Sequence, residues 1–333
     1  MKIEKNHYNM KLWIDTDAGV DDSTAILLAL NAPDVEIVGI SCVGGNAHLD
    51  NVIKNVNRTL LVFGKKPGHD IPIYAGCKCA LVYPPMVIPE IHGQDGLGDI
   101  KNEDFQINEN DFKCDDSKHA TQALIDCASK CHYSEGSEED DGLVLLTLGP
   151  LTNIAIALRL APEKMINGIK KIIVMGGAED GIGNTSPYAE FNFRCDPEAA
   201  QIVFSTFPQE RIFLASWTLT QAFSFKTQED LKLYQSNHTN TKIGEFIKQT
   251  WQSIVDFTHG DMLMADPLAS FIACYPHYVL EVEKLRINIV LSGEKVGMSE
   301  VFNDEKNEGA TTIVKKIDFD KYKEVFLNLM KHH

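Results

Sequence analysis

The feature that most constrains the fold is a short segment near the start of the chain. An apolar run at residues 10–14 leads into Asp15-Thr16-Asp17-Ala18-Gly19-Val20-Asp21-Asp22. An apolar run ahead of a polar turn that contains glycine is typical of a buried strand that ends there. Residues 23–30, which follow the turn, favour a helix. Because α/β folds bind their ligands at the carboxyl ends of strands, the segment predicts such a fold with a functional site after its first strand.

The same segment carries an unusual density of negative charge. It holds four carboxylates, Asp15, Asp17, Asp21 and Asp22, within eight residues. Like charges this close repel one another unless a cation lies among them. Ligand sets made only of oxygen atoms suit a hard divalent ion, either Ca²⁺ or Mg²⁺. The segment therefore indicates a metal-dependent enzyme.

Composition excludes some classes of function. The chain has 333 residues and a formal net charge of −16, which argues against general nucleic-acid binding because that needs a basic face. A small neutral substrate stays compatible with that charge. No apolar stretch approaches the roughly 20 residues that span a bilayer. The polar first nine residues lack the apolar core of a signal peptide, and the eight scattered cysteines fit reduced thiols. We expect a cytoplasmic protein.

Apolar runs and helix-favouring segments alternate along most of the chain. Further strands are expected at residues 35–42, 71–74, 143–148, 171–175, 211–215 and 287–291, and helices at 48–63, 120–130, 152–160 and 318–331. This alternation predicts a single α/β domain, residues 10–333, with a mostly parallel, Rossmann-like open sheet flanked by helices. A short polar tail, residues 1–9, precedes it. Residues 77–110 show no clear period, and the acidic stretch 134–141 is expected to be a surface loop.

Amide and carboxylate side chains follow several of these strands, so they should gather at one edge of the sheet. They are Asn46, Asn184, Glu190, Asn192 and Asp266. Each has a structural alternative: Asn46 as a turn residue, Asp266 before Pro267 as a helix N-cap, and Glu190 and Asn192 as surface alternation. Their convergence on strand ends favours a site that binds a cation and hydroxyl groups.

Several motifs in order resemble one family, the inosine–uridine-preferring nucleoside hydrolases, over roughly residues 10 to 330. The motifs are the Asp15-to-Asp22 segment, Val43-Gly44-Gly45-Asn46, His92-Gly93-Gln94-Asp95-Gly96-Leu97-Gly98, Gly149-Pro150-Leu151-Thr152-Asn153, Met175-Gly176-Gly177, Ala189-Glu190-Phe191-Asn192 and Asp266-Pro267. The resemblance implies cleavage of the N-glycosidic bond of ribonucleosides to ribose and a free purine or pyrimidine base.

The resemblance also implies a Ca²⁺ site. Its ligands would be Asp17, Asp22 (bidentate), Asp266 and a main-chain carbonyl just before Gly149. Relatives often have Thr at that last position, whereas this chain has Leu148, with Thr147 one residue earlier, so the choice between the two carbonyls stays open.

The family's catalytic roles transfer to matching positions. Asp21 is implied as the general base that takes a proton from a calcium-bound water, with Asp15 orienting its neighbours from behind. The ribose would be held by Asn46, Asn184, Glu190 and Asn192, together with Asp21, Asp266 and the calcium ion.

The chain departs from the family at the residue before the last calcium ligand. Relatives carry His or Trp there, and this chain has Ala265, so the group that protonates the departing base is not assigned. His92, Cys42 and His259 are the candidates: His92 by its motif, Cys42 by its place at the end of a strand, and His259 as part of a lid.

Two other functions fit part of the pattern. Asp15-x-Asp17 after an apolar strand is also found in Mg²⁺-dependent dehalogenase-type phosphatases. That class expects a Thr soon after the second Asp and a downstream Lys near an acidic pair, whereas Ala18-Gly19-Val20-Asp21-Asp22 follows here. A non-catalytic nucleoside-binding protein of the same fold is the second alternative. A homodimer or homotetramer is expected from the family alone.

Overall fold

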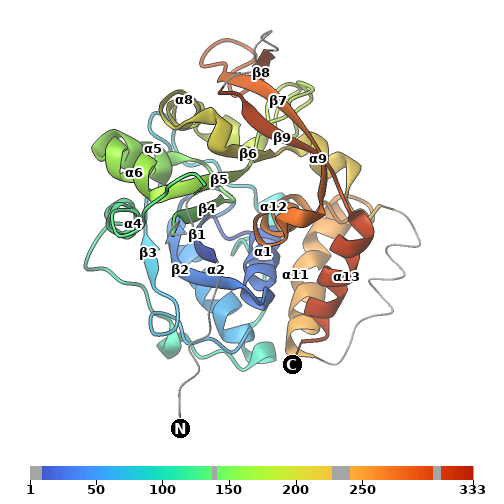
Figure 1. Ribbon diagram of the computed structural model, residues 1–333. Coiled ribbons are helices and arrows are strands. Elements are labelled where there is room, and N and C mark those ends of the chain that lie inside the picture. The colour runs from blue at the N-terminus through green and yellow to red at the C-terminus, as the bar shows by residue number, and fades with distance from the viewer. Residues whose placement is uncertain (1–9, 137–140, 227–240, 303–308, 333) are drawn as a thin grey trace.

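A nine-stranded sheet forms the centre of the computed structural model (Figure 1). The structure describes residues 10–136, 141–226, 241–302 and 309–332, so the predictions for the tail 1–9 and for part of the acidic loop 134–141 fall outside it. The strand order is β3-β2-β1-β4-β5-β6-β9-β7-β8. The strands are β1 (Met10–Thr16), β2 (Val35–Cys42), β3 (Ile73–Ala75), β4 (Leu143–Thr147), β5 (Ile169–Met175), β6 (Ile212–Ala215), β7 (Val279–Ile289), β8 (Ser299–Phe302) and β9 (Thr311–Ile317).

The order of the strands determines where a site can form. The first seven strands of this order, β3-β2-β1-β4-β5-β6-β9, pair in parallel with their neighbours. Strand β7 runs antiparallel to both of its neighbours, β9 and β8. The chain order reverses at β1, which lies between β2 and β4, and such a reversal opens a crevice at the carboxyl ends of the strands. Asp15, near the end of β1, is in register with Ser41 and Thr147 on its two neighbours. The acidic segment therefore starts at this crevice.

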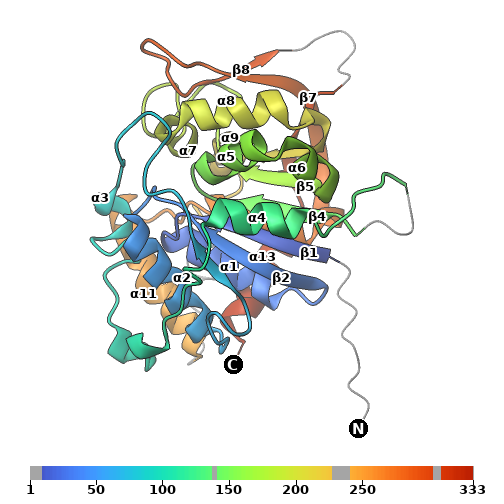
Figure 2. The ribbon, with the colours of Figure 1, turned by 90° about the vertical axis from the view of Figure 1, so that its left-hand side faces the viewer.

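Helices cover both faces of the sheet (Figures 1 and 2). On β1, Leu12 and Ile14 pack into the core on one face while Trp13 packs into the core on the other, as expected for a strand buried on both sides. The first face is covered by α1 (Val20–Asn31), α2 (Leu49–Val62), α11 (Lys242–Phe257), α12 (Ala265–Cys274) and α13 (Phe319–Met330). The second is covered by α4 (Ala120–Ala128), α5 (Thr152–Leu160), α6 (Pro162–Gly168) and α8 (Pro197–Thr206). The shorter helices of the described residues are α3 (Pro89–His92), α7 (Phe191–Cys195), α9 (Trp217–Ala222) and the 3₁₀ turns η1 (Asn102–Phe105), η2 (Glu109–Asp111), η3 (Gln209–Arg211) and η4 (Pro276–Tyr278).

The predicted α/β class and mostly parallel sheet are confirmed, while the far edge of the sheet was predicted only in part. Strands β8 and β9 were not predicted, and β7 begins at Val279, eight residues before the expected start at Ile287. The early part of β7 mixes apolar and charged residues, and Leu280 and Val282 are 58% and 46% exposed. A strand exposed in this way has no continuous apolar run to reveal it.

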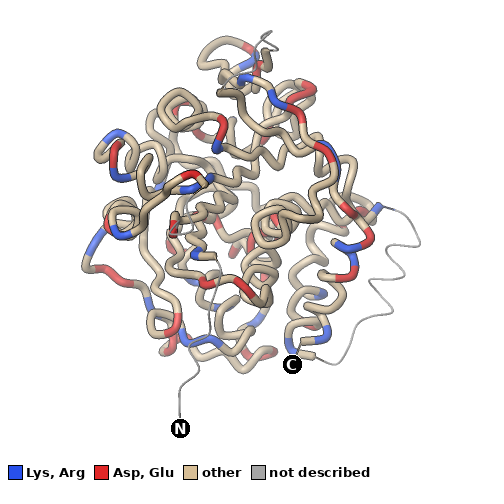
Figure 3. Tube along the Cα trace, in the orientation of Figure 1, with Lys and Arg blue, Asp and Glu red and all other residues tan. Residues whose placement is uncertain are grey.

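Charged side chains of both signs occur together on the surface of α13. Acidic and basic segments are interspersed along α13 (Figure 3), where Lys321 and Glu324 form an ion pair of 2.8 Å. Over the part of the chain that the structure describes, no helix is both long and apolar enough to cross a membrane.

Candidate functional site

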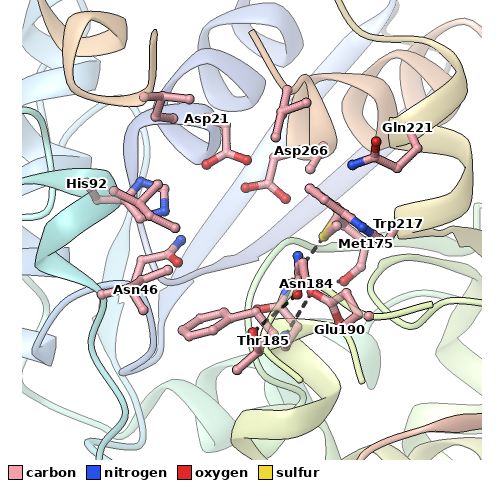
Figure 4. A pocket seen from close by; sticks show the side chains of 18 of the residues that line it. Asp21, Asn46, His92, Met175, Asn184, Thr185, Glu190, Trp217, Gln221 and Asp266 are labelled. Atoms are coloured by element: carbon pink, nitrogen blue, oxygen red, sulfur yellow. Dashed lines mark hydrogen bonds between the residues drawn. The ribbon is translucent and has the colours of Figure 1, made fainter. Parts of the chain in front are cut away.

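A cavity of about 840 Å³ opens at the carboxyl ends of the central strands. Asp21 and Asp266 reach into it from α1 and α12, while Asn184 and Glu190 approach from the chain after β5 (Figure 4). His92 and Asn46 line one side, and Trp217 and Gln221 of α9 line the other. Predicted side chains that follow β1, β2 and β5 are thus brought together with His92 of α3 and Asp266 of α12 around one space.

Three carboxylates converge at one end of this cavity. Asp21, Asp22 and Asp266 each offer one carboxylate oxygen to this group. These three oxygen atoms lie within 4.8 Å of one another. Asp21 and Asp22 occupy the first turn of α1, and Asp266 is the second residue of α12. Helix N-termini favour negative charge, which offsets part of the repulsion. The N-cap of α12 is Met264, so the alternative of Asp266 as an N-cap is wrong.

Backbone and side-chain donors hold the neighbouring carboxylates in place. Asp22 accepts hydrogen bonds from the Gly19 N–H at 2.9 Å and from Asn46 Nδ2 at 3.0 Å. Asp17 Oδ2 accepts one from the Asn46 N–H at 2.6 Å. Asn46 thus connects the ends of β1 and β2 through two aspartates, so its role exceeds that of a turn residue. We call Asp17, Asp21, Asp22 and Asp266 the acidic cluster.

The acidic cluster has the properties of a cation site. Among the described residues, Asp17 Oδ1 and Asp266 Oδ1 are buried and accept no hydrogen bond. Burial, followed by the charge of a neighbouring aspartate, raises the pKa of both groups well above the ordinary range. A divalent cation would supply the partner that these oxygens lack and would remove the repulsion. The donor set therefore fits a hard metal ion.

Asp21 differs from its neighbours in exposure. It is partly exposed to the cavity, whereas Asp17 and Asp22 are fully buried. Burial and then the charge of Asp22 raise the pKa of Asp21 to about 7. A carboxyl group whose pKa lies near neutrality, facing open space, is suited to accept a proton at working pH.

Asp15 lies behind the acidic cluster and is fully buried. Its Oδ2 accepts hydrogen bonds from Ser41 Oγ and, at 2.8 Å, from Asn153 Nδ2. Asn153 also donates to the Cys42 carbonyl and accepts from the Cys77 N–H. These bonds tie the ends of β1 and β2 to the chain beyond β3, which places Asp15 in a supporting position away from the cavity.

The carbonyls of Thr147 and Leu148 are the two predicted alternatives for the main-chain ligand before Gly149. Leu148 lines the cavity, and its carbonyl oxygen accepts a hydrogen bond of 2.8 Å from Asn192 Nδ2. Thr147 is still part of β4 and is not among the residues that line the cavity. Of the two, the geometry favours Leu148.

Glu190 is fixed by backbone donors at the start of α7. Its carboxylate accepts hydrogen bonds from the N–H groups of Asn192, Phe193 and Gly177 at 2.8–3.1 Å. Burial raises the pKa of Glu190 to about 7 despite these bonds. Glu190 is thus a buried N-cap rather than part of an alternating surface.

His92 lies on the cavity wall as its motif predicted. Its Nδ1 accepts a hydrogen bond of 3.2 Å from the Val20 N–H, so the proton of the neutral ring lies on Nε2. Burial lowers the pKa of His92 to about 4. The ring is therefore neutral near pH 7 and can donate from Nε2.

Two other predicted residues do not reach the cavity. Cys42 is the last residue of β2, and its side chain is packed in the core, so the expectation that it faces the pocket is wrong. His259 is exposed in a left-handed turn after α11, with φ of 57°, and the neighbouring Phe257 and Thr258 line the cavity in its place.

The prediction missed cavity-lining residues from α9, from α11 and from the chain after β5. We call Trp217, Gln221, Ile254, Phe257 and Ile182 the outer wall; all five line the cavity. Trp217 and Gln221 follow β6, so the strand-end argument applied to residues 211–215 would have found them. Ile182 and Phe257 are 63% and 54% exposed, and no motif marks them.

Comparison with known proteins gives a consistent result. The family model "Inosine-uridine preferring nucleoside hydrolase" matches residues 12–324. The chain is 32% identical over 326 residues to the inosine-uridine preferring nucleoside hydrolase of Leishmania major, and the match covers 94% of each chain. A match of 36% over 197 residues to an uncharacterized protein of Schizosaccharomyces pombe covers 59% of this chain and 58% of that one. A solved inosine-guanosine nucleoside hydrolase superposes with a TM-score of 0.82 at 26% identity, covering 97% of this chain and 99% of that chain.

Proposed function

This chain belongs to the inosine-uridine preferring nucleoside hydrolase family, a family of nucleosidases, and we propose that it hydrolyses ribonucleosides with the help of calcium bound at the acidic cluster. The observation that carries the proposal is the meeting of Asp21, Asp22 and Asp266 within 4.8 Å at the cavity end. The buried Oδ1 atoms of Asp17 and Asp266 support it, since neither has a hydrogen-bond partner among the described residues.

The proposed ligands of Ca²⁺ are Asp17, Asp22, Asp266 and the Leu148 carbonyl. Oxygen ligands from carboxylates and a main-chain carbonyl are the set that calcium prefers. When bound, the ion would lower the pKa of a coordinated water and offer further positions to hydroxyl groups of the sugar. Asp21, which faces the cavity, would take the proton from that water.

The remaining polar residues are proposed to hold the ribose. Asn46, Asn184, Glu190 and Asn192 line the cavity together with Asp21 and Asp266. N-glycoside cleavage develops positive charge on the sugar, and fixed carboxylates and amide oxygens around it stabilise that charge where it forms. Asn192 Oδ1 is buried without a hydrogen-bond partner among the described residues, so it is available to a ligand hydroxyl.

His92 is the one leaving-group candidate on the cavity wall, and its proposed role is limited. An imidazole with a pKa of about 4 carries no extra proton near pH 7. We therefore assign His92 Nε2 a hydrogen bond to the departing base rather than full proton transfer from an imidazolium ion.

Release of reducing sugar from inosine and uridine, with and without EDTA, tests the proposal. We expect turnover of at least one nucleoside, loss of turnover with EDTA, and recovery on addition of Ca²⁺. A non-catalytic nucleoside-binding protein would bind nucleosides without releasing sugar. A dehalogenase-type phosphatase would release phosphate from p-nitrophenyl phosphate in the presence of Mg²⁺. Cytoplasmic location and a homodimer or homotetramer remain predictions.

A further inference from the structure

Asn55, a fully buried residue of α2, connects two separate segments of the candidate site. Its Nδ2 donates hydrogen bonds to the carbonyl oxygen of Ala18 at 3.1 Å and to that of Asp95 at 2.9 Å. Ala18 belongs to the segment between β1 and α1, and Asp95 belongs to the turn after α3, whose last residue is His92. One side chain thus joins the backbone beside the acidic cluster to the chain that carries His92.

The amide of Asn55 is held in a single orientation. Arg58 Nη1 donates to Asn55 Oδ1 at 3.2 Å and to Asp95 Oδ2 at 2.6 Å. Because a guanidinium group can only donate, the amide oxygen of Asn55 faces Arg58 and the NH₂ group faces the two carbonyls. A Cβ at Gly96 would lie 3.2 Å from Asn55 Nδ2, so the turn after α3 is packed directly on this amide. Asn55 is therefore a fixed pair of donors.

Ala18 adopts a backbone conformation that alanine disfavours. Its φ of 35° lies in the left-handed region, and the residue is fully buried. A residue with a Cβ populates this region roughly tenfold less readily than glycine does. The hydrogen bond from Asn55 to the Ala18 carbonyl opposes a return of this peptide to an ordinary φ, so it stabilises the left-handed conformation.

The conformation of Ala18 determines how both oxygens of Asp22 are held. On one side of Ala18, its own N–H donates to Thr16 Oγ1 at 3.0 Å, and that hydroxyl donates to Asp22 Oδ1. On the other side, the Gly19 N–H donates to Asp22 Oδ2 at 2.9 Å. A Cβ at Gly19 would lie 2.8 Å from His92 Nδ1, so the same segment packs against the His92 ring. A change of φ at Ala18 would disturb the hydrogen bonds to both oxygens of Asp22.

We propose that Asn55 is a positioning residue, which holds Ala18 in the left-handed conformation so that Asp22 can bind the metal ion. This role rests on the proposed calcium site, and Asn55 itself is not among the residues that line the cavity. The same amide binds the turn after α3, so we expect the order of the cation site and the order of the His92 segment to be coupled.

Calorimetric titration of the metal-free protein with Ca²⁺ tests this role. Asn55→Ala should weaken Ca²⁺ binding about 10- to 100-fold, as expected when a group that orients a metal ligand is removed. Asn57→Ala is the matched control, because Asn57 is fully buried on the same helix but bonds to the Ile53 carbonyl and the Lys113 N–H. This control should lose stability and still bind Ca²⁺ as tightly as the wild type does.

A double variant separates positioning from a general loss of stability. Glycine adopts a positive φ without the help of Asn55, so Ala18→Gly should compensate for the lost hydrogen bond. In the Ala18→Gly background, the loss of Ca²⁺ affinity caused by Asn55→Ala should be about tenfold smaller than in the wild-type background. Ala18→Gly combined with Asn57→Ala should show no such coupling. If Asn55→Ala does not fold, Asn55→Ser takes its place in the same comparison.

The positioning role is contradicted if the variant at Asn55 binds Ca²⁺ as tightly as Asn57→Ala does, or if Ala18→Gly restores no affinity. In either case Asn55 would only support the fold. If the wild type itself binds no Ca²⁺, the calcium site fails, and the role of Asn55 fails with it. Calorimetry of the wild type therefore distinguishes the failure of the proposed site from the failure of this role.

Discussion

The acidic cluster and the outer wall face the same cavity but are built in different ways. The cluster's aspartates sit at strand ends and helix first turns, and donors such as the Asn46 N–H and the Gly19 N–H fix them. The outer wall comes from α9, the end of α11 and the chain near Ile182, where Ile182 and Phe257 are more than half exposed. Under the proposed function, the chemistry would fall to rigid, buried positions, while the departing base would meet a partly open wall made mainly of apolar and aromatic side chains.

The strongest test of this division is Asp21→Asn. If Asp21 is the base and Asp22 and Asp266 hold the metal, kcat should fall about 10²- to 10⁴-fold with little change in KM. Thermal stabilisation by added Ca²⁺ should persist, because the proposed metal ligands are untouched. Loss of that stabilisation would instead make Asp21 a ligand, which its place in the three-carboxylate group would explain equally well.

Glu190→Gln tests whether a buried, rigidly held carboxyl group of the site affects the free energy of unfolding. Burial raises the pKa of Glu190 from its ordinary 4.5 to about 7, so the folded protein binds this proton more tightly than the unfolded chain does. The wild type should lose about 3 kcal/mol from this group as pH rises from about 4.5 through 7, at about 1.4 kcal/mol per pH unit. Glu190→Gln cannot ionise and should not show this loss.

The measurement is urea unfolding of both proteins at several pH values and saturating Ca²⁺, so that the acidic cluster contributes equally. As the pH rises, the free energy of unfolding of Glu190→Gln should increase relative to that of the wild type. Parallel curves for the two proteins would mean that Glu190 keeps an ordinary pKa in the folded state.

Gly45→Ala tests how closely the acidic cluster is packed. A Cβ at Gly45 would lie 2.1 Å from Asp17 Oδ2, and the backbone there is not left-handed, so the conflict is steric. We expect Ca²⁺ affinity, measured by calorimetry, to fall about 10- to 100-fold. Gly293→Ala is the control: its φ of 79° makes alanine strained there, but a Cβ meets nothing within 4 Å, so the variant should lose some stability and keep its Ca²⁺ affinity. If Gly45→Ala binds Ca²⁺ as tightly as Gly293→Ala does, the protein accommodates a Cβ at Gly45 without displacing Asp17.

The same division explains what the sequence could predict. Strands β1, β2, β4, β5 and β6 each contain an apolar run that ends in a glycine-containing turn or a polar segment. Local sequence was therefore enough to predict these strands and the acidic segment after β1. The exposed start of β7 has no such run. Cys42 was misplaced because one position along a strand decides whether a side chain meets the core or the cavity. His259 and Phe257 are two residues apart, and only the turn after α11 determines which of them faces inward.

Trp217→Ala probes the outer wall, where we expect the smallest effect. The indole lies beside Gln221 on the cavity side of α9 (Figure 4). Loss of stacking or packing against a base costs about 1.4 kcal/mol, so KM should rise about tenfold while kcat changes little. Phe257→Ala, at a side chain that is 54% exposed, should raise KM about threefold, since less contact is lost. Rates for inosine and uridine measured in parallel show whether either side chain discriminates between the bases. A fall in kcat as large as that of Asp21→Asn would mean that the outer wall takes part in the chemistry, and that the division between the two regions is wrong.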